Sequence, residues 1–188
     1  DNTREGHTGA TDQPCVVGLV TARGGSKGLY RKNVLPLAGR PVIAWTIEEA
    51  LRAGCIERLI VSTDDEEIAA ASRECGAEVP FLRPPELAQD DTGHMDVILH
   101  ALEWLERTED SRPDYLLLLQ PTSPLRTAED IQAAYRIAVD QDADSVISVH
   151  EAHQHPFLAK RVSSDGLLVD YMPDTPPPGS RSRRRQNF

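Results

Sequence analysis

The sequence predicts an α/β protein built around a mostly parallel β-sheet. Short apolar strands alternate with amphipathic helical segments from about residue 15 to residue 149, a pattern typical of βαβ units. Residues 115–119 (YLLLL) form an unbroken apolar run, as expected for a strand that helices cover on both faces. Right-handed crossovers would place helices on both sides of this sheet, which gives a three-layer fold.

The first strand and helix have clear boundary residues. A valine-rich run at 15–20 is too short for a helix and leads to the Gly24-Gly25 loop, which predicts a buried strand. Pro41 suits the first turn of a helix, and Gly54 suits the position just after its end. Between them, mostly apolar residues recur at helical spacing: Val42, Ile43, Thr46, Ile47, Ala50 and Leu51.

The remaining elements continue the alternation, and capping residues or glycines mark several of their ends. In chain order we expect a strand at 59–61, a helix from Asp64/Asp65 to Cys75, an edge-like strand at 79–82, a helix with an apolar face over 98–105, the strand at 115–119, a helix capped by Thr127, and a strand at 144–149.

Composition excludes several classes of protein. The 188 residues suit one or two domains, and their net charge of -10 argues against a nucleic-acid partner. No apolar run approaches the ~20 residues of a membrane span, so we expect no membrane partner. Residues 1–13 are polar and predict a disordered leader. Cys15, Cys55 and Cys75 fit no disulfide or zinc pattern, and we expect buried, reduced thiols in a cytoplasmic protein.

The loop at 22–33 follows the first strand, where parallel sheets usually bind ligands. Its glycines allow the backbone to approach anionic oxygens, while Arg23, Lys27 and Lys32 supply positive charge and Ser26 a hydroxyl donor. The spacings of a P-loop and of a dinucleotide fingerprint are absent. The loop itself therefore favours phosphate binding, with a solvated turn as the alternative. The other loops in equivalent positions are 62–65, 120–126 and 150–156.

Several further motifs occur in order over residues 15–156. They are Arg23-Gly-Gly-Ser-Lys-Gly-Leu-x-x-Lys-Asn33, Pro36-Leu-x-Gly-x-Pro41, Ala44-Trp-Thr-Ile47, Val61-Ser-Thr-Asp64, Phe81-Leu-Arg-Pro84, Leu119-Gln-Pro-Thr-Ser-Pro-Leu-Arg126, Asp144-Ser-Val146 and His155-Pro156. In this order the motifs resemble the CMP-sialic acid synthetase (acylneuraminate cytidylyltransferase) family.

The resemblance implies a Rossmann-like nucleotidyltransferase fold that binds CTP. It also implies transfer of CMP to the anomeric hydroxyl of a sialic-acid-like nonulosonic acid, release of pyrophosphate, Mg²⁺ as cofactor, and a homodimer. Two alternatives remain open: a truncated CTP-binding domain without catalysis, and a cytidylyltransferase for 3-deoxy-manno-octulosonate.

The resemblance also assigns roles to individual residues. Arg23 and Lys27 would be catalytic, because they would stabilise charge on the leaving pyrophosphate. The nucleotide-binding residues would be Ala22, Arg23, Gly24, Gly25, Ser26, Lys27, Lys32, Asn33, Arg83 and His94. The sugar-binding residues would be Gln120, Thr122, Ser123 and Arg185. No metal ligand is identified.

Several positions have two interpretations. Arg83 would contact the cytosine end or be a surface arginine beside prolines. His94 stands where the family commonly has a small hydroxyl residue, and it could hydrogen-bond the pyrimidine, stack on it or face solvent. Asp64 and Asp65 could bind a metal or begin a helix. Arg126 could be functional or pair with an acidic neighbour.

We expect three segments along the chain. Residues 1–13 are the leader, residues 14–156 the CTP-binding nucleotidyltransferase domain, and residues 157–188 a partial dimerisation or sugar-binding segment or an irregular tail. The family normally continues with further strands and an Asp-x-Asp pair that holds Mg²⁺. We therefore expect the C-terminal part, with its metal ligands, to be truncated. The sequence does not identify the acceptor among nonulosonic acids.

Overall fold

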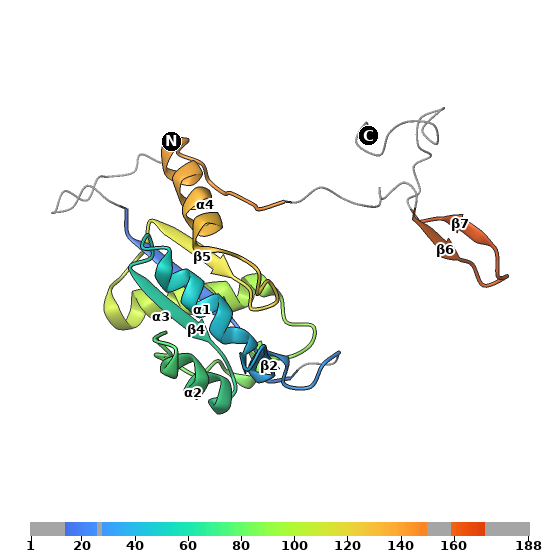
Figure 1. Ribbon diagram of the computed structural model, residues 1–188, viewed down its shortest axis with the longest axis horizontal. Coiled ribbons are helices and arrows are strands. Elements are labelled where there is room, and N and C mark those ends of the chain that lie inside the picture. The colour runs from blue at the N-terminus through green and yellow to red at the C-terminus, as the bar shows by residue number, and fades with distance from the viewer. Residues whose placement is uncertain (1–13, 26–27, 150–158, 172–188) are drawn as a thin grey trace. The chain divides into compact units, whose positions relative to one another are not determined.

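A computed structural model describes residues 14–25, 28–149 and 159–171. At its centre is a parallel sheet of β1 (Val16–Thr21), β4 (Arg58–Ser62) and β5 (Tyr115–Leu119), in the order β4-β1-β5 (Figure 1). β1 lies in the middle and pairs along its length with both neighbours. The structure confirms the mostly parallel α/β fold and these three predicted strands.

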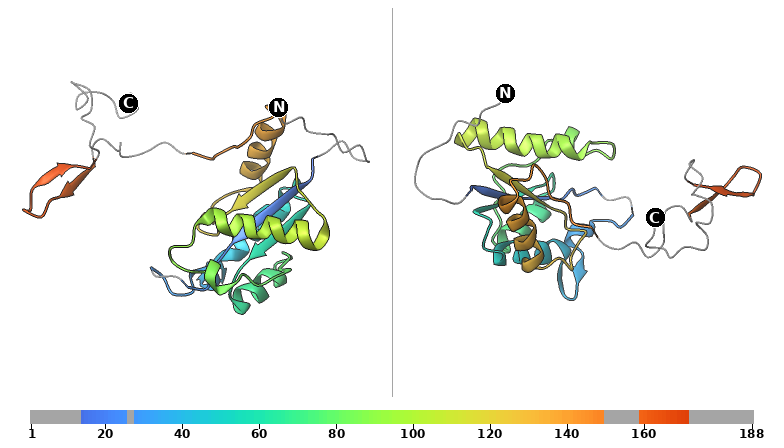
Figure 2. Two further views of the ribbon diagram at one scale, coloured as in Figure 1. Left: turned by 180° about the vertical axis from the view of Figure 1, so that it is seen from behind. Right: turned by 90° about the horizontal axis from the view of Figure 1, so that it is seen from above.

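Helices cover both faces of the sheet (Figure 2). Side chains alternate between the faces along β1, as the period of two in a strand requires. Val20 belongs to the buried cluster of Ile43 and Ile47, whereas Leu19 belongs to the buried cluster of Ala101 and Leu105. The first face carries α1 (Val42–Arg52), α2 (Glu66–Glu74) and α4 (Ala128–Asp140), and the second carries α3 (His94–Glu109).

Shorter elements connect the sheet and helices. They are the 3₁₀ helices η1 (Lys32–Val34) and η2 (Pro85–Leu87) and a hairpin of β2 (Pro36–Leu37) and β3 (Arg40–Pro41). The strand expected at 79–82 runs along the edge of β4 but forms only isolated parallel bridges, at Glu78 and Leu82. Pro80 has no N–H to donate, so a continuous ladder cannot form there.

Most predicted boundary residues begin or end the helices as expected. Asp65 caps α2 by accepting hydrogen bonds from two backbone N–H groups of the first turn, at 2.9 and 3.0 Å. Thr127 and Asp130 form a capping box at the start of α4. Gly54 and Gly76 follow α1 and α2 with positive φ angles of 67° and 92°.

Two expectations about strands are wrong. Residues 145–149 form no strand, and Ile147 and Val149 are 79% and 88% exposed. An apolar alternation becomes a strand only beside a hydrogen-bonding partner, and no described residue pairs with the outer edge of β5. β5 is also less covered than its apolar sequence suggests, because only Leu119 of its five residues is buried.

The chain divides into two compact units, residues 1–146 and 147–188. The described part of the second unit is an antiparallel hairpin of β6 (Lys160–Val162) and β7 (Leu168–Asp170). Gly166 adopts a φ of 77° in its turn, a conformation that glycine allows at little cost. The predicted domain boundaries after residues 13 and 156 lie outside the described residues and stay predictions.

In the described parts of the chain, no helix combines the length and the apolar character needed to cross a membrane.

The three cysteines differ in burial from the prediction. Cys15, Cys55 and Cys75 are free thiols, but each is half-buried rather than buried as expected. Burial nevertheless raises the pKa of all three thiols, which favours the unreactive neutral form.

Two leucines of α3 test how this helix packs on the sheet. Leu105 is buried, whereas Leu99 is 47% exposed. We expect Leu105→Ala to lower the free energy of unfolding by about 2–5 kcal/mol, because it leaves a cavity beneath the helix. Leu99→Ala is the matched control and should cost less than about 1.5 kcal/mol, because less apolar surface is lost. Urea unfolding measures both, and equal losses would contradict the packing of α3.

Candidate functional site

A cavity of about 320 Å³ opens at the carboxyl end of the sheet. Its walls come from the end of β1 and the loop that follows, from η1, from the segment between β4 and α3, and from the loop after β5. The lining residues are Thr21, Arg23, Lys32, Asn33, Arg83, Leu87, Gln89, Asp90, Thr92, His94, Val97, Gln120, Pro121 and Thr122. The cavity therefore lies where a parallel sheet is expected to bind its ligand.

The cavity brings together residues that are far apart in the sequence. The predicted site residues among its lining are Arg23, Lys32, Asn33, Arg83, His94, Gln120 and Thr122. Four other predicted residues are not part of the lining: Ala22, Gly24, Gly25 and Ser123. Three predicted residues lie outside the described parts of the chain: Ser26, Lys27 and Arg185.

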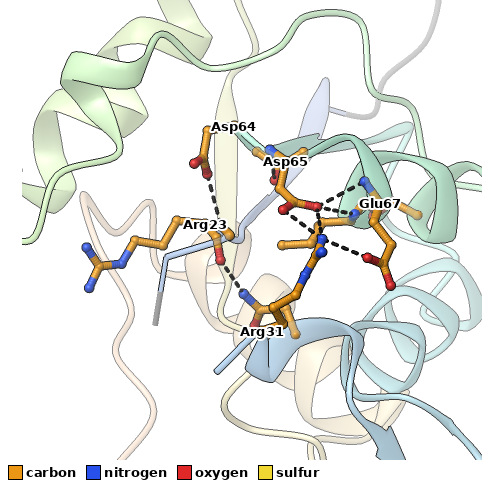
Figure 3. A network of polar contacts seen from close by, with 10 residues as sticks. Arg23, Arg31, Asp64, Asp65 and Glu67 are labelled. Carbon is orange, nitrogen blue, oxygen red and sulfur yellow. Dashed lines mark hydrogen bonds and ion pairs between the residues drawn. The ribbon is translucent and has the colours of Figure 1, made fainter. Parts of the chain in front are cut away.

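Two adjacent aspartates fasten the glycine loop to the end of β4 (Figure 3). Asp64 Oδ1 accepts a hydrogen bond from the backbone N–H of Gly24 at 3.0 Å. Both carboxylate oxygens of Asp65 accept from Arg31 Nη2, at 2.7 and 2.8 Å, while the same carboxylate caps α2. Of the two interpretations of this pair, the helix N-terminus is confirmed for Asp65.

Arg31 is a further residue of this network, which the sequence motifs do not single out. This residue adopts a left-handed conformation, with φ 52° and ψ 34°, and its guanidinium reaches both Asp65 and Glu67 Oε2, the latter at 2.8 Å (Figure 3). Arg31 and Asp65 are separated by 34 residues. The only sequence signal was one more arginine in a basic loop opposite an acidic pair.

Arg23 and Asn33 connect the two ends of the loop. Asn33 is buried, and its Nδ2 donates to the backbone oxygen of Arg23 at 3.1 Å. The Arg23 guanidinium extends along the cavity, pairs with Asp90 Oδ1 at 2.8 Å and donates to Gln89 O at 3.0 Å. An intramolecular carboxylate therefore already contacts the arginine that sequence reasoning assigned to a triphosphate.

Arg83 lies inside the protein, so the interpretation as a surface arginine is wrong. Its side chain donates to Ser62 Oγ (3.2 Å), to Ser62 O (2.5 Å) and to Leu87 O (3.4 Å). Burial lowers the pKa of its guanidinium, with a small opposing effect of the nearby Asp64 carboxylate. Arg83 therefore ties the end of β4 to η2 and adds a positive charge to the cavity wall.

His94 and Gln120 form a second part of the cavity wall. His94 is the first residue of α3, and Gln120 directly follows β5. His94 Nε2 lies 3.0 Å from Thr21 Oγ1, and His94 Nδ1 lies 3.3 Å from Gln120 Nε2. Thr122 Oγ1 donates to Gln120 Oε1 at 3.5 Å. A chain of hydrogen-bonding side chains thus links the ends of β1 and β5.

The loop after β5 is shaped by its own hydrogen bonds. The Ser123 N–H donates to Gln120 O at 3.2 Å, so Ser123 closes a turn. Arg126 Nη2 donates to the same oxygen at 3.3 Å, and burial lowers the pKa of this guanidinium. Arg126 thus holds the backbone beneath Gln120.

The described residues do not form a metal site. Nowhere in them do three or more His, Cys, Asp or Glu side chains gather closely enough to hold an ion. The carboxylates nearest the loop are also occupied: Asp64 by Gly24, Asp65 by Arg31, and Asp90 by Arg23. The described residues therefore hold no such cluster for the Mg²⁺ that the family resemblance implies, and this cofactor stays a prediction.

Solved structures share this fold. A CMP:2-keto-3-deoxy-manno-octonic acid synthetase complexed with CTP matches with a TM-score of 0.58 and 22% identity, over 69% of this chain and 49% of its own. The 4-diphosphocytidyl-2C-methyl-D-erythritol synthase of Anaerococcus prevotii matches with a TM-score of 0.57 and 15% identity, over 85% and 64%. At these identities the likeness concerns the fold alone: the chain shares the α/β fold of these two proteins.

The chain belongs to the cytidylyltransferase family, whose model matches residues 17–178. The CMP-N,N'-diacetyllegionaminic acid synthase of Legionella pneumophila is 39% identical over 154 residues, 82% of this chain and 66% of that protein. An N-acylneuraminate cytidylyltransferase of Streptococcus agalactiae is 36% identical over 154 residues, 81% of this chain and 36% of that protein. These similarities confirm the resemblance drawn from the motifs. The chain spans about a third to two thirds of the length of these curated relatives.

Two neighbouring glycines test how tightly the loop is fastened. A Cβ on Gly24 would lie 2.7 Å from Asp65 Oδ2, whereas a Cβ on Gly25 would meet no described heavy atom within 4 Å. Asp65 cannot move aside without losing Arg31 and the helix cap. We expect Gly24→Ala to lower the free energy of unfolding by about 1–3 kcal/mol.

Gly25→Ala is the matched control for this change. It should alter the free energy of unfolding by less than about 1 kcal/mol, since the new methyl group faces open space. Thermal and urea unfolding of the two variants give the comparison. A Gly24→Ala variant as stable as Gly25→Ala would contradict the close approach of the loop to Asp65.

Proposed function

We propose that the protein transfers CMP from CTP to the anomeric hydroxyl of a sialic-acid-like nonulosonic acid and releases pyrophosphate. One observation carries the proposal. A single cavity is lined by the cationic side chains of Arg23, Lys32 and Arg83 and by the uncharged hydrogen-bonding groups of Gln120 and Thr122. The first set suits a triphosphate, and the second suits a polyhydroxylated sugar. Membership of the cytidylyltransferase family supports this assignment.

The reaction needs positioning and charge neutralisation more than a protein nucleophile. The anomeric oxygen of the sugar attacks the α-phosphorus of CTP and loses its proton. The bond from the α-phosphorus to the bridging oxygen of the β-phosphate breaks, and that oxygen leaves with pyrophosphate. Arg23 and Lys32 would stabilise the charge that develops on the leaving group, together with Lys27 and Ser26 of the same loop.

The names of the relatives suggest the acceptor class. Those relatives act, by name, on N-acylneuraminate, diacetyllegionaminic acid and pseudaminic acid. All are nine-carbon 2-keto acids, and Gln120 belongs to the motif that favours such acceptors in the resemblance. A solved structure with the same fold is a CMP:2-keto-3-deoxy-manno-octonic acid synthetase, which supports that sugar as the second candidate acceptor. CTP binding without turnover is the remaining alternative.

Three other properties belong to the proposal only through the resemblance. Magnesium is the usual companion of a triphosphate, but the described residues supply no ligand set for it, and no step above involves it. We also propose a homodimer and a cytoplasmic location. Size-exclusion chromatography with light scattering tests the first, and fractionation of the source cells tests the second.

Pyrophosphate release tests the reaction directly. The full chain is incubated with CTP, Mg²⁺ and, in separate reactions, N-acetylneuraminate, diacetyllegionaminate, pseudaminate or 3-deoxy-manno-octulosonate. We expect release with at least one nine-carbon acid and formation of the matching CMP-sugar. Release only with the eight-carbon acid would favour the second acceptor. CTP binding without release in any reaction would leave only the non-catalytic alternative.

Removal of a loop cation tests the triphosphate contact. We expect Arg23→Ala and Lys27→Ala each to raise the KM or Kd for CTP by about tenfold or more, because a charge-assisted hydrogen bond is lost. Arg112→Ala is the control: it removes an arginine whose side chain is 78% exposed and pairs with Glu106, away from the cavity. Unchanged turnover and CTP affinity in both loop variants would refute the triphosphate role of the loop.

A further inference from the structure

The imidazole of His94 uses both of its ring nitrogens within the protein. Nε2 lies 3.0 Å from Thr21 Oγ1 at the end of β1, and Nδ1 lies 3.3 Å from Gln120 Nε2 just after β5. Thr21 and His94 are 73 positions apart in the sequence, and His94 and Gln120 are 26 apart. All three residues line the cavity. His94 therefore bridges two strands that carry different parts of the site.

The donor and acceptor types determine the direction of these hydrogen bonds. An amide nitrogen can only donate, so Gln120 Nε2 donates to His94 Nδ1. The neutral ring then carries its proton on Nε2 and donates it to Thr21 Oγ1. On the other side of the amide, Gln120 Oε1 accepts from Thr122 Oγ1 at 3.5 Å. The nitrogen and the oxygen of the Gln120 amide thus each have a hydrogen-bond partner within the protein.

We infer that His94 is a positioning residue for Gln120 and so helps determine acceptor recognition. By holding one amide hydrogen, His94 prevents the amide from turning over and leaves the second N–H and one carbonyl lone pair for a ligand. A fixed donor and acceptor side by side suit adjacent hydroxyl and carboxylate groups of a sugar acid. The inference rests on the proposed function, since Gln120 is the residue assigned to the sugar.

The same geometry argues against a contact between His94 and the cytosine base. A hydrogen bond to the base would need a free ring nitrogen, and neither is free in this arrangement.

The tautomer of His94 gives a test that does not depend on activity. A nitrogen-15 correlation spectrum of the histidine side chains, recorded where the rings are neutral, distinguishes a proton on Nε2 from one on Nδ1. Comparison with His94→Ala assigns the signal. We expect the Nε2–H form in the full chain and a shift of the Nδ1 resonance in Gln120→Ala. An Nδ1–H form, or no response to Gln120→Ala, would overturn the inference.

Steady-state kinetics separate positioning of Gln120 from a contact with the nucleotide. We expect His94→Ala to raise the KM for the nine-carbon acceptor by about threefold to tenfold, the effect of one net hydrogen bond, with the KM for CTP unchanged. Alanine also suits the start of a helix, so α3 should persist. His94→Asn keeps an acceptor near the Nδ1 position and should recover part of the loss.

A double-mutant cycle completes the test. If His94 acts through Gln120, His94→Ala should have no further effect on the acceptor KM once Gln120→Ala is present. Independent, multiplying effects, or a rise in the KM for CTP, would overturn the inference. Met95→Ala is the control, because Met95 is 62% exposed on the same helical turn and outside the cavity lining. If the full chain shows no turnover, the proposed function fails, while the tautomer measurement still decides the role of His94.

Discussion

Asp64 and Asp65 hold the glycine loop against the end of β4, and most of the site depends on that contact. The described residues of the loop belong to no β-strand, so their backbone groups need hydrogen-bond partners elsewhere. Asp64 accepts from Gly24, and Asp65 accepts from Arg31 while it caps α2. The loop begins at the end of β1, and the two aspartates follow β4. Because β4 pairs directly with β1, these contacts hold the loop to one and the same sheet. The conformation of this loop is therefore a property of the whole core.

Beyond this contact, further hydrogen bonds between distant residues organise the cavity. Arg83 joins the end of β4 to η2, Asn33 joins the two ends of the loop, and His94 joins the ends of β1 and β5. Each bridge adds a polar contact between segments that line the site. Arg83 and Asn33 are buried. At such positions a lost polar partner costs more than the bond itself contributes, so these two bridges favour one arrangement over looser ones.

Sequence patterns predicted the parts of the fold that depend on local physics. Valine-rich runs predicted β1 and β4, and capping residues placed the ends of α2 and α4. The predicted strand at 144–149 failed because pairing requires a neighbour that local hydrophobicity cannot specify. Within the site, seven of the fourteen residues that line the cavity are predicted site residues. The sequence did not predict the hydrogen bonds of Arg31 to Asp65, because the two residues are 34 positions apart and no local pattern links them.

The ion pair between Arg23 and Asp90 makes nucleotide binding an exchange of anions. A triphosphate that engages Arg23 would replace an internal carboxylate 2.8 Å away, so the gain is the difference between two attractions. The Asp90 carboxylate then loses its attraction to Arg23. Added salt weakens both the old and the new contact. Affinity for the nucleotide should consequently vary less steeply with ionic strength than the number of cations in the loop would suggest.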